Sequence, residues 1–426
     1  MSKRALLAAA VLCVAGYVFV YATGRANPPI RSDGYSYSVY LPAWFIYGDA
    51  SLSAVARDCC GGEFPAHTAI IRWPATRRWV NAHPIGVAVL QAPFFTVGHA
   101  LTRWSNLSAD GFTLYYQHGA GIAGVFWAVA GLVAVRALLL RHFRDGVVTA
   151  TLLAVLFGTG LYHYATYDSS YSHVYSFCLL ACFLLLTEKW WEQATAGRSI
   201  AIGAIAGLIV LVRHTNVLFL LTFAAYGVTS AAGARTRAAA LVSRWRALAV
   251  IAAAGLATIA PQLAIYEKST GRLLVSSYGD LTFTFTSPHL WGVLFSVQKG
   301  LFFWSPLLLA GVTGYIVRNP AVRAYAFGAA IVFAADAYLI ASWWDWQFGA
   351  SYGHRGFVDL LPLFAVGLAA FFDWMSRSTL RQYAAAAVAG AGVFLSMFQM
   401  FQYWNGVLPM SDLTWDQYRE IFLRLR

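Results

Sequence analysis

The sequence predicts an all-α polytopic membrane protein, with about eleven transmembrane helices and one long loop on the outer face. Of the 426 residues, 59% are hydrophobic and 11% are charged, whereas soluble domains carry about 25% charged residues. Apolar runs recur along the whole chain, and basic residues gather in every second loop between them. The 16% aromatic content fits aromatic belts at a membrane surface.

The apolar runs place the expected helices. A span needs about 20 predominantly apolar residues to cross about 30 Å of hydrocarbon. Runs near this length predict spans at 5–22, 119–140, 147–164, 172–187, 200–212, 217–230, 248–266, 301–317, 324–341, 357–373 and 383–404. The short run 200–212 ends at the polar residues 213–216, so we expect it to form a tight hairpin with 217–230. A further apolar stretch, 85–101, is interrupted by polar residues and by Pro93.

The basic residues orient these spans. Lysines and arginines cluster at 136–144, 189–198, 235–246, 318–323 and 377–381. Short loops rich in Lys and Arg are cytoplasmic. All the basic clusters lie on the cytoplasmic side only if an even number of crossings separates the N-terminus from Arg141. This condition therefore favours a helix at 85–101 that lies along the outer surface over a helix that spans.

This topology leaves one long outer loop, 23–118, and the acidic residues concentrate on the same face. We expect a single domain, 1–426, in a bacterial inner membrane, with any active site facing the periplasm. The net charge of +12 is explained by topology, because no basic stripe interleaved with aromatics lies in a soluble segment. Nucleic acid is therefore not an expected partner.

The N-terminus and the cysteines suggest no processing and no disulfide framework. Lys3 and Arg4 precede an apolar run that resembles a signal peptide, but no cleavage site follows, so we expect an uncleaved helix. Of five cysteines, only the adjacent Cys59 and Cys60 lie in a loop, and adjacent cysteines rarely pair. Their spacing to Glu63 and His67 matches no zinc motif, so we expect an incidental grouping.

Asp33 is the first candidate for chemistry. It lies in Arg31-Ser-Asp-Gly-Tyr-Ser-Tyr37, about ten residues after the first apolar run. Asp-Gly often marks only a turn. Acidic residues close to hydrocarbon are costly, however, and usually mark a function. We therefore predict a catalytic role for Asp33 and a substrate-binding role for Tyr37.

Asp168 is the second candidate, in a loop of fewer than ten residues between two expected spans. It could orient an acceptor, share a metal with Asp33, or cap the following helix. His173, which follows in the same segment, is a candidate for substrate binding.

Cations and aromatics suggest where an anionic ligand would bind. Lys299 opens an expected membrane helix, where it could neutralise a phosphate or extend to lipid headgroups. The segment 343–356 is dense in tryptophan and ends in Gly-His-Arg-Gly. Tryptophan stacks on sugar faces, and arginine binds phosphate with two hydrogen bonds. Its candidate binding residues are Trp344, Asp345, His354 and Arg355. Asp336, in the preceding expected helix, is a candidate partner for Arg355.

On these residues the chain resembles the GT-C superfamily of integral-membrane glycosyltransferases, in particular the lipid A aminoarabinose transferases and protein O-mannosyltransferases. Those families place a catalytic Asp just after the first helix, where Asp33 lies, and a second acid in the next outer loop, where Asp168 lies. Their juxtamembrane helices correspond to 85–101, and 81–86 resembles the start of such a helix. The chain shows no Asp-Glu pair after the first helix, no Lys-Pro-Pro run and no large C-terminal soluble domain, which leaves the acceptor class open.

The resemblance implies transfer of a sugar from a polyprenyl-phosphate donor to a glycan, lipid or protein acceptor, with inversion and with Asp33 as general base. Lys299 and Arg355 would stabilise the leaving phosphate. No cofactor is required, although Asp33 and Asp168 could hold a divalent cation. A flippase or exporter of lipid-linked sugars is the alternative; such proteins more often have short loops and repeat symmetry. A purely structural membrane subunit would need none of these charged residues.

Overall fold

The structure is a computed structural model that describes residues 1–26, 28–65, 68–276, 282–317 and 319–425. Helices make up most of it, and the one small sheet pairs β1 (Ile70–Arg72) with β2 (Trp79–Asn81) in antiparallel order. Seven helices of the described residues are long and apolar enough to cross a membrane. They are α1 (Ser2–Ala22), α6 (Leu114–Leu139), α9 (His173–Glu192), α13 (Trp245–Thr270), α17 (Pro320–Ser342), η3 with α18 (Arg355–Leu360 and Leu361–Met375), and α19 (Thr379–Trp404). The prediction of a helical, multi-pass membrane protein is confirmed at this level.

The other four expected spans form shorter helices. They are α7 (Asp145–Phe157), α10 (Ala196–Val212), η2 with α11 (His214–Leu220 and Leu221–Ala225), and α16 (Leu307–Ile316). Two of the expected runs are interrupted, because α8 (Leu161–Thr166) is separated from α7 by a glycine-containing break and α15 (Leu301–Trp304) ends before Pro306. Proline lacks a backbone N–H and so disfavours an uninterrupted helix. The finer expectation of about eleven spans stays a prediction.

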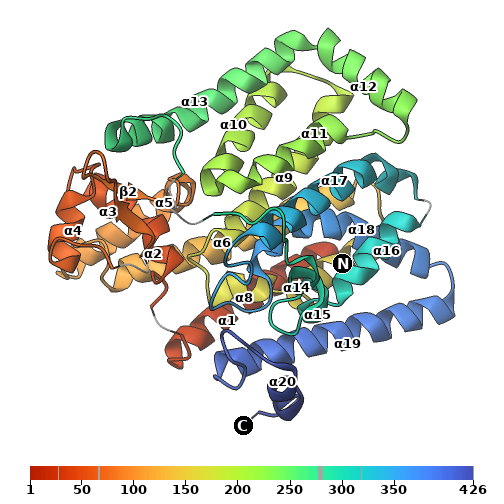
Figure 1. Ribbon diagram of the computed structural model, residues 1–426. Coiled ribbons are helices and arrows are strands. Elements are labelled where there is room, and N and C mark those ends of the chain that lie inside the picture. The colour runs from red at the N-terminus through yellow and green to blue at the C-terminus, as the bar shows by residue number, and fades with distance from the viewer. Residues whose placement is uncertain (27, 66–67, 277–281, 318, 426) are drawn as a thin grey trace.

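The long loop after α1 folds into a small structured region at one end of the helices. It contains α2 (Asp33–Ser38), α3 (Tyr40–Phe45), α4 (Ser53–Cys60), the β-hairpin and α5 (Gly86–Trp104). Figure 1 shows this region in red and orange at the left, while α12 (Ala231–Ser243), in green, lies at the opposite side of the molecule. α5 is not one of the seven described helices that meet the criteria for a span, and it packs against α6. Its position on the membrane surface stays a prediction.

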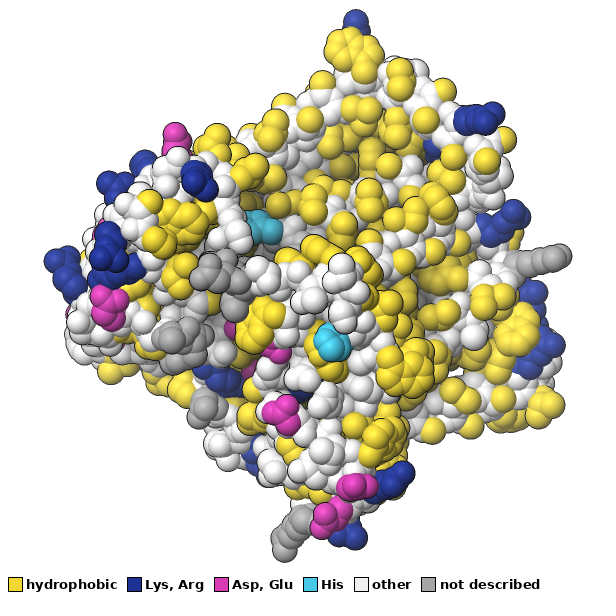
Figure 2. All heavy atoms as spheres, viewed as in Figure 1, with side chains coloured by type: hydrophobic (Ala, Val, Ile, Leu, Met, Phe, Trp, Pro, Cys, Tyr) yellow, Lys and Arg dark blue, Asp and Glu magenta, His cyan; other side chains and the backbone are white. Residues whose placement is uncertain are grey.

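The outer surface of the helices is apolar where lipid is expected. Figure 2 shows hydrophobic side chains spread over the upper region, where α10 and α13 lie in Figure 1. Within the hydrophobic window of α13 only 6% of the residues are buried inside the protein. The two helices nevertheless pack closely, since a Cβ added at Gly203 would lie 2.3 Å from the backbone oxygen of Ile251. An apolar helix with so little protein cover is expected to face hydrocarbon chains.

The two adjacent cysteines correct one expectation. Cys59 and Cys60 form a disulfide with each other, so the prediction that they stay unpaired is wrong. The pair ends α4, and the next residue, Gly61, takes a left-handed φ of 63°. The two cysteines therefore lie where the helix ends. The general rarity of disulfides between adjacent cysteines gave no indication of this position. Of the rejected zinc grouping, His67 lies outside the described residues.

Candidate functional site

Two close backbone approaches bring the two candidate aspartates to the same end of the bundle. A Cβ added at Gly34 would lie 2.1 Å from Ser170 Oγ, and one added at Gly124 would lie 1.8 Å from the backbone oxygen of Ser169. Neither position has room for a larger residue. The short loop between α8 and α9 therefore packs between α2 and α6, next to the residue that opens α2.

Asp33 forms an ion pair with Arg355. It is the first residue of α2, and its Oδ2 lies 3.0 Å from a guanidinium nitrogen of Arg355, the first residue of η3. The side chains are 26% and 15% exposed, so the pair is open to solvent on one side. The structure thus brings together two residues that the sequence analysis selected separately. Asp33 starts a helix, and its carboxylate is not used in an Asp-Gly turn.

The surroundings of Asp33 keep its carboxylate ionised. Burial raises the pKa of Asp33, but the Arg355 guanidinium outweighs this effect, helped by His83, His173 and Arg213, and the pKa lies below its usual range. At neutral pH the group is therefore a carboxylate, which is the form that can accept a proton.

Neutral aromatic groups lie beside this pair. The rings of Tyr37 and His83 have centroids 4.3 Å apart, and the Tyr37 hydroxyl donates to Ser172 Oγ over 3.0 Å. Burial lowers the pKa of His83 to about 4, although Asp33 acts in the opposite direction. His83 is thus neutral at pH 7. His83 lies in the 81–86 segment but was not predicted as a site residue.

A buried carboxylate, Asp359, holds the neighbouring cation, Arg213. It lies 2.8 Å from His173 Nδ1, 3.2 Å from an Arg213 guanidinium nitrogen and 3.3 Å from Asn216 Nδ2. His173, a predicted binding residue, is therefore engaged with Asp359. Arg213 and Asp359 were not predicted as site residues. The available signal was the acidic residue inside an expected span, since such residues are rare and usually functional.

Phe348 lies against both arginines. The guanidinium carbons of Arg213 and Arg355 are each 5.6 Å from the centroid of its ring. Phe348 has a φ of 57°, which is unusual for a residue with a bulky side chain. A Cβ added at Gly356 would lie 2.7 Å from the Phe348 ring, so this glycine provides space for it. The Gly-His-Arg-Gly segment thus places Arg355 and makes room for the ring beside it.

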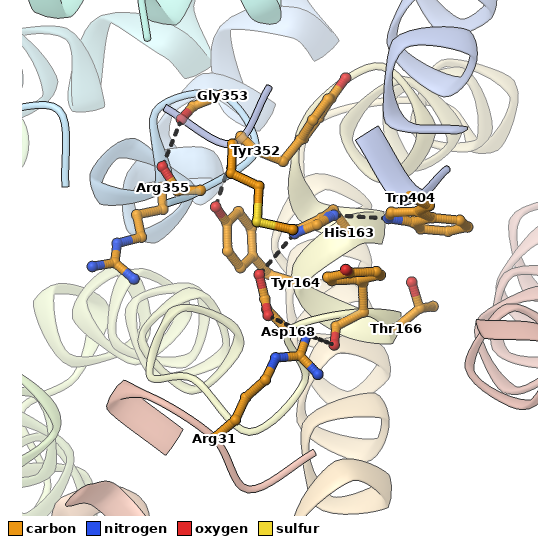
Figure 3. Close-up of polar contacts among 12 residues, drawn as sticks. Arg31, His163, Tyr164, Thr166, Asp168, Tyr352, Gly353, Arg355 and Trp404 are labelled. Atoms are coloured by element: carbon orange, nitrogen blue, oxygen red, sulfur yellow. Dashed lines mark hydrogen bonds and ion pairs between the residues drawn. The ribbon is translucent and has the colours of Figure 1, made fainter. Parts of the chain in front are cut away.

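Asp168 belongs to a separate and closed network, shown in Figure 3. One carboxylate oxygen lies 2.7 Å from Arg31, and the other lies 2.9 Å from His163 Nε2. On the far side of the imidazole, Trp404 Nε1 donates to His163 Nδ1 over 2.9 Å. The indole N–H can only donate, so Nδ1 accepts and Nε2 carries the proton given to Asp168. In Figure 3 the Arg355 side chain points away from this network.

The chemistry of Asp168 follows from these partners. Its side chain is 7% exposed. Burial raises its pKa, but Arg31 and His163 outweigh the effect and hold the pKa well below the usual range. The alternative of a helix cap is wrong, because the N-cap of α9 is Ser172. The catalytic role predicted for Asp168 stays a prediction.

Lys299 connects two segments near the site. Its ammonium donates to the backbone oxygens of Ser351 and of Met410, the latter over 2.8 Å. Burial, and then the charge of Arg355, lowers the pKa of Lys299 to about 7. The ammonium therefore ties the segment that leads to Arg355 to the C-terminal tail. Its predicted contact with phosphate stays a prediction.

The remaining residues of the tryptophan-rich segment lie in different settings. His354 Nε2 lies 2.9 Å from the backbone oxygen of Trp346, while its buried Nδ1 has no hydrogen-bond partner in the described part of the chain. Trp344 is 55% exposed, and Asp345 Oδ1 accepts from the Gly349 N–H over 3.2 Å. Asp345 thus closes a turn.

Two further expectations concern partners of these residues. Arg355 pairs with Asp33, and Asp336 Oδ2 is buried without a hydrogen-bond partner among the described residues, so the guessed pair of Asp336 with Arg355 does not form. No group of three or more His, Cys, Asp or Glu side chains in the described ranges is arranged to hold a metal ion. The possible divalent cation stays a prediction.

Two sequence comparisons found no match. No protein-family model matches the chain, and no curated protein is significantly similar to it.

Proposed function

We propose that the chain is a membrane glycosyltransferase of the GT-C type, which transfers a sugar from a polyprenyl-phosphate donor to a glycan, lipid or protein acceptor. The observation that carries the proposal is the ion pair of Asp33 with Arg355 at the end of the helices where the long loop folds. It puts a carboxylate and a phosphate-binding cation in direct contact. In this proposal the chain has about eleven spans in a bacterial inner membrane, and the pair faces the periplasm.

Each residue has a defined part in the proposed reaction. The oxygen of an acceptor hydroxyl attacks the anomeric carbon, and the bond from that carbon to the phosphate oxygen breaks with inversion. The hydroxyl proton moves to Asp33, which is ionised and partly exposed. The polyprenyl phosphate leaves with two negative charges, and Arg355 stabilises them. A positioned base is worth about 10²–10⁴ in rate, and an electrostatic donor about 10²–10³.

Neighbouring residues complete the proposed site. The exposed Trp344 offers a face on which a sugar can stack, whereas the predicted binding residue Tyr37 is 3% exposed and packs against His83. Lys299 supports the Arg355 segment through its contacts with two backbone oxygens. Asp168 holds Arg31 and His163 in place, so we assign it to positioning the loop beside Asp33. Membrane lipids surround the helices and deliver the donor.

A flippase or exporter of lipid-linked sugars is the competing function. The buried cluster of Asp359, Arg213 and His173 favours it, since charged groups within a helix bundle often line a transport path. The two functions can be distinguished in detergent, because transport cannot occur where there is no second compartment, whereas sugar transfer can. Covalent transfer by the purified protein in detergent supports the transferase.

The substrate class can be tested in the native cells. Deletion of the gene should remove one sugar from the envelope glycans and cause the polyprenyl-phosphate sugar to accumulate, as measured by mass spectrometry. The parent protein and the exposed-surface variant Arg272→Ala should restore the glycan, whereas Asp33→Asn should not. Unchanged glycans and lipids after deletion would exclude the proposed function.

A further inference from the structure

The two arginines of the site differ in how firmly their carboxylate partners hold them. Arg213 contacts Asp359, whose side chain is 1% exposed and which also contacts His173 and Asn216. Arg355 contacts Asp33, whose side chain is 26% exposed. If Arg355 moved away, solvent could hydrate the Asp33 carboxylate. An ion pair with this exposure is easier to exchange than a buried one.

Both guanidiniums are partly exposed and lie beside the same aromatic ring. The Arg355 and Arg213 side chains are 15% and 21% exposed, and both pack against Phe348. The planar guanidinium binds phosphate through two parallel hydrogen bonds, which a carboxylate of the protein also satisfies. The donor is a phosphodiester whose two non-bridging oxygens share one negative charge, so it matches the Asp33 carboxylate in charge and in geometry. It can therefore exchange with Asp33 on Arg355, and the monoester that leaves after transfer, with two charges, competes more strongly.

We propose that the donor phosphate binds Arg355 by displacing Asp33, with Arg213 supplying a second positive charge, so that donor binding releases the catalytic base. This inference rests on the proposed function for the identity of the donor. In the absence of donor, Asp33 occupies the cation that the phosphate needs. With donor bound, Asp33 loses its ion pair and turns to the acceptor hydroxyl.

The exchange makes two events thermodynamically linked. The contact between Asp33 and Arg355 weakens phosphate binding. Phosphate binding weakens that contact by the same free energy, because coupling between two binding events is reciprocal. The base becomes stronger only when a donor is present. The acceptor is thus activated after the donor has bound, which protects the site from unproductive deprotonation.

The linkage predicts an unusual direction for one variant. Asp33→Asn removes the competitor and should tighten binding of a phosphate monoester, by about tenfold if the displaced pair costs about 1.4 kcal/mol. Arg355→Gln should weaken binding, and Arg213→Gln should also weaken it. In the double variant Asp33→Asn/Arg355→Gln the gain should vanish, because the competition runs through Arg355.

The probe is farnesyl phosphate, a short isoprenyl phosphate monoester that stands for the leaving polyprenyl phosphate and competes for the same arginine. It is titrated into the purified full chain in detergent by calorimetry. Inorganic phosphate tests whether the isoprenyl chain is needed, and phosphatidylglycerol tests whether any anionic lipid suffices. Arg272→Gln, on the exposed surface, is the matched arginine control and should keep the parent affinity. Arg355→Lys keeps the positive charge but cannot make two parallel hydrogen bonds, so its affinity for the probe should lie between those of the parent and Arg355→Gln.

The outcomes separate this inference from the proposed function. Tighter binding in Asp33→Asn that disappears in the double variant supports the exchange, whether or not a sugar is transferred. Unchanged or weaker binding in a folded, monodisperse Asp33→Asn protein overturns it, even if the parent transfers sugar. The same tightening in the Arg355→Gln background would mean simple repulsion by Asp33, and would also overturn it.

Discussion

Asp33 and Asp168 are both paired with an arginine at the same end of the bundle, yet their surroundings differ. Asp168 is 7% exposed and is held by Arg31 on one oxygen and by His163 on the other, with Trp404 fixing the imidazole. Asp33 is 26% exposed and forms one ion pair, with Arg355. The Asp168 carboxylate is buried and contacts a partner through each oxygen, whereas the Asp33 carboxylate keeps an approach from solvent. The difference underlies the proposed roles, in which Asp168 positions its loop and Asp33 acts as the base.

The largest expected effect is on the stability of the Asp168 network. Asp168→Asn removes the charge opposite the partly buried Arg31, and breaking such a pair costs about 3–5 kcal/mol. We expect a clearly lower unfolding midpoint in detergent, and a smaller loss of transfer by the molecules that remain folded. Asp416→Asn, at an exposed pair, is the control and should change the midpoint little. Equal midpoints for both variants would remove the distinction between the two aspartates.

The same network predicts how stability depends on pH. The pKa of Asp168 is lowered in the folded state, so the folded protein binds its proton less readily than the unfolded chain. The stability from this group is therefore fully present above the ordinary aspartate pKa of about 4 and is lost as the pH falls towards the folded value. Asp168→Asn should remove this acid-dependent part of the unfolding curve.

Arg355 should affect the reaction itself. We expect Arg355→Gln to lower transfer by about 10²–10³, because the leaving phosphate loses its cation. It should also move the acid limb of the pH–rate profile upward, because the pKa of Asp33 rises without Arg355, while His83, His173 and Arg213 remain nearby. Values of kcat/KM across pH test both effects, because they report the enzyme without donor, in which Asp33 and Arg355 are paired. An acid limb unchanged from the parent would show that Arg355 does not control Asp33.

Lys299 should have a smaller effect than Arg355. Its ammonium donates to two backbone oxygens, so Lys299→Ala should weaken donor binding mainly by loosening the segment that holds Arg355. A rise in the donor KM of about tenfold is expected, as for the loss of about 1.4 kcal/mol. Arg272→Ala should keep the parent KM. If the donor KM of Lys299→Ala equals that of Arg272→Ala, Lys299 has no part in donor binding.

Much of the fold, but little of the site, could be predicted from the sequence. Apolar runs found all seven long helices because length and hydropathy are local properties. Asp33 and Arg355 were each selected by their local sequence. Their contact could not be predicted, because it depends on how α2 packs beside η3.

The second cluster shows the same limit. Arg213 was interpreted as the end of a hairpin, and Asp359 lay inside an expected apolar span. Their contact, and the fixing of Asp168 by Trp404 through His163, arise only when distant helices pack together. Charged residues inside expected spans were the one local signal that could have found Asp359.

The smallest effect is expected from a cysteine substitution that tests on which side of the membrane the two aspartates lie. Ser108→Cys, in the segment between α5 and α6, should react with an impermeant thiol reagent in intact cells, because we predict that α5 does not cross the membrane. Activity and stability should be unchanged. Labelling only after permeabilisation would mean that α5 spans, and the predicted orientation of the site would be wrong.

The central claim is that Asp33 accepts the proton of the acceptor. The direct measurement is the transfer rate of purified, monodisperse Asp33→Asn in detergent, with the native polyprenyl-phosphate sugar extracted from cells that lack the gene. The amide is nearly isosteric but cannot accept the proton, so we predict a fall of about two orders of magnitude or more, although donor binding is not weakened. Transfer by Asp33→Asn at near the parent rate would contradict the account.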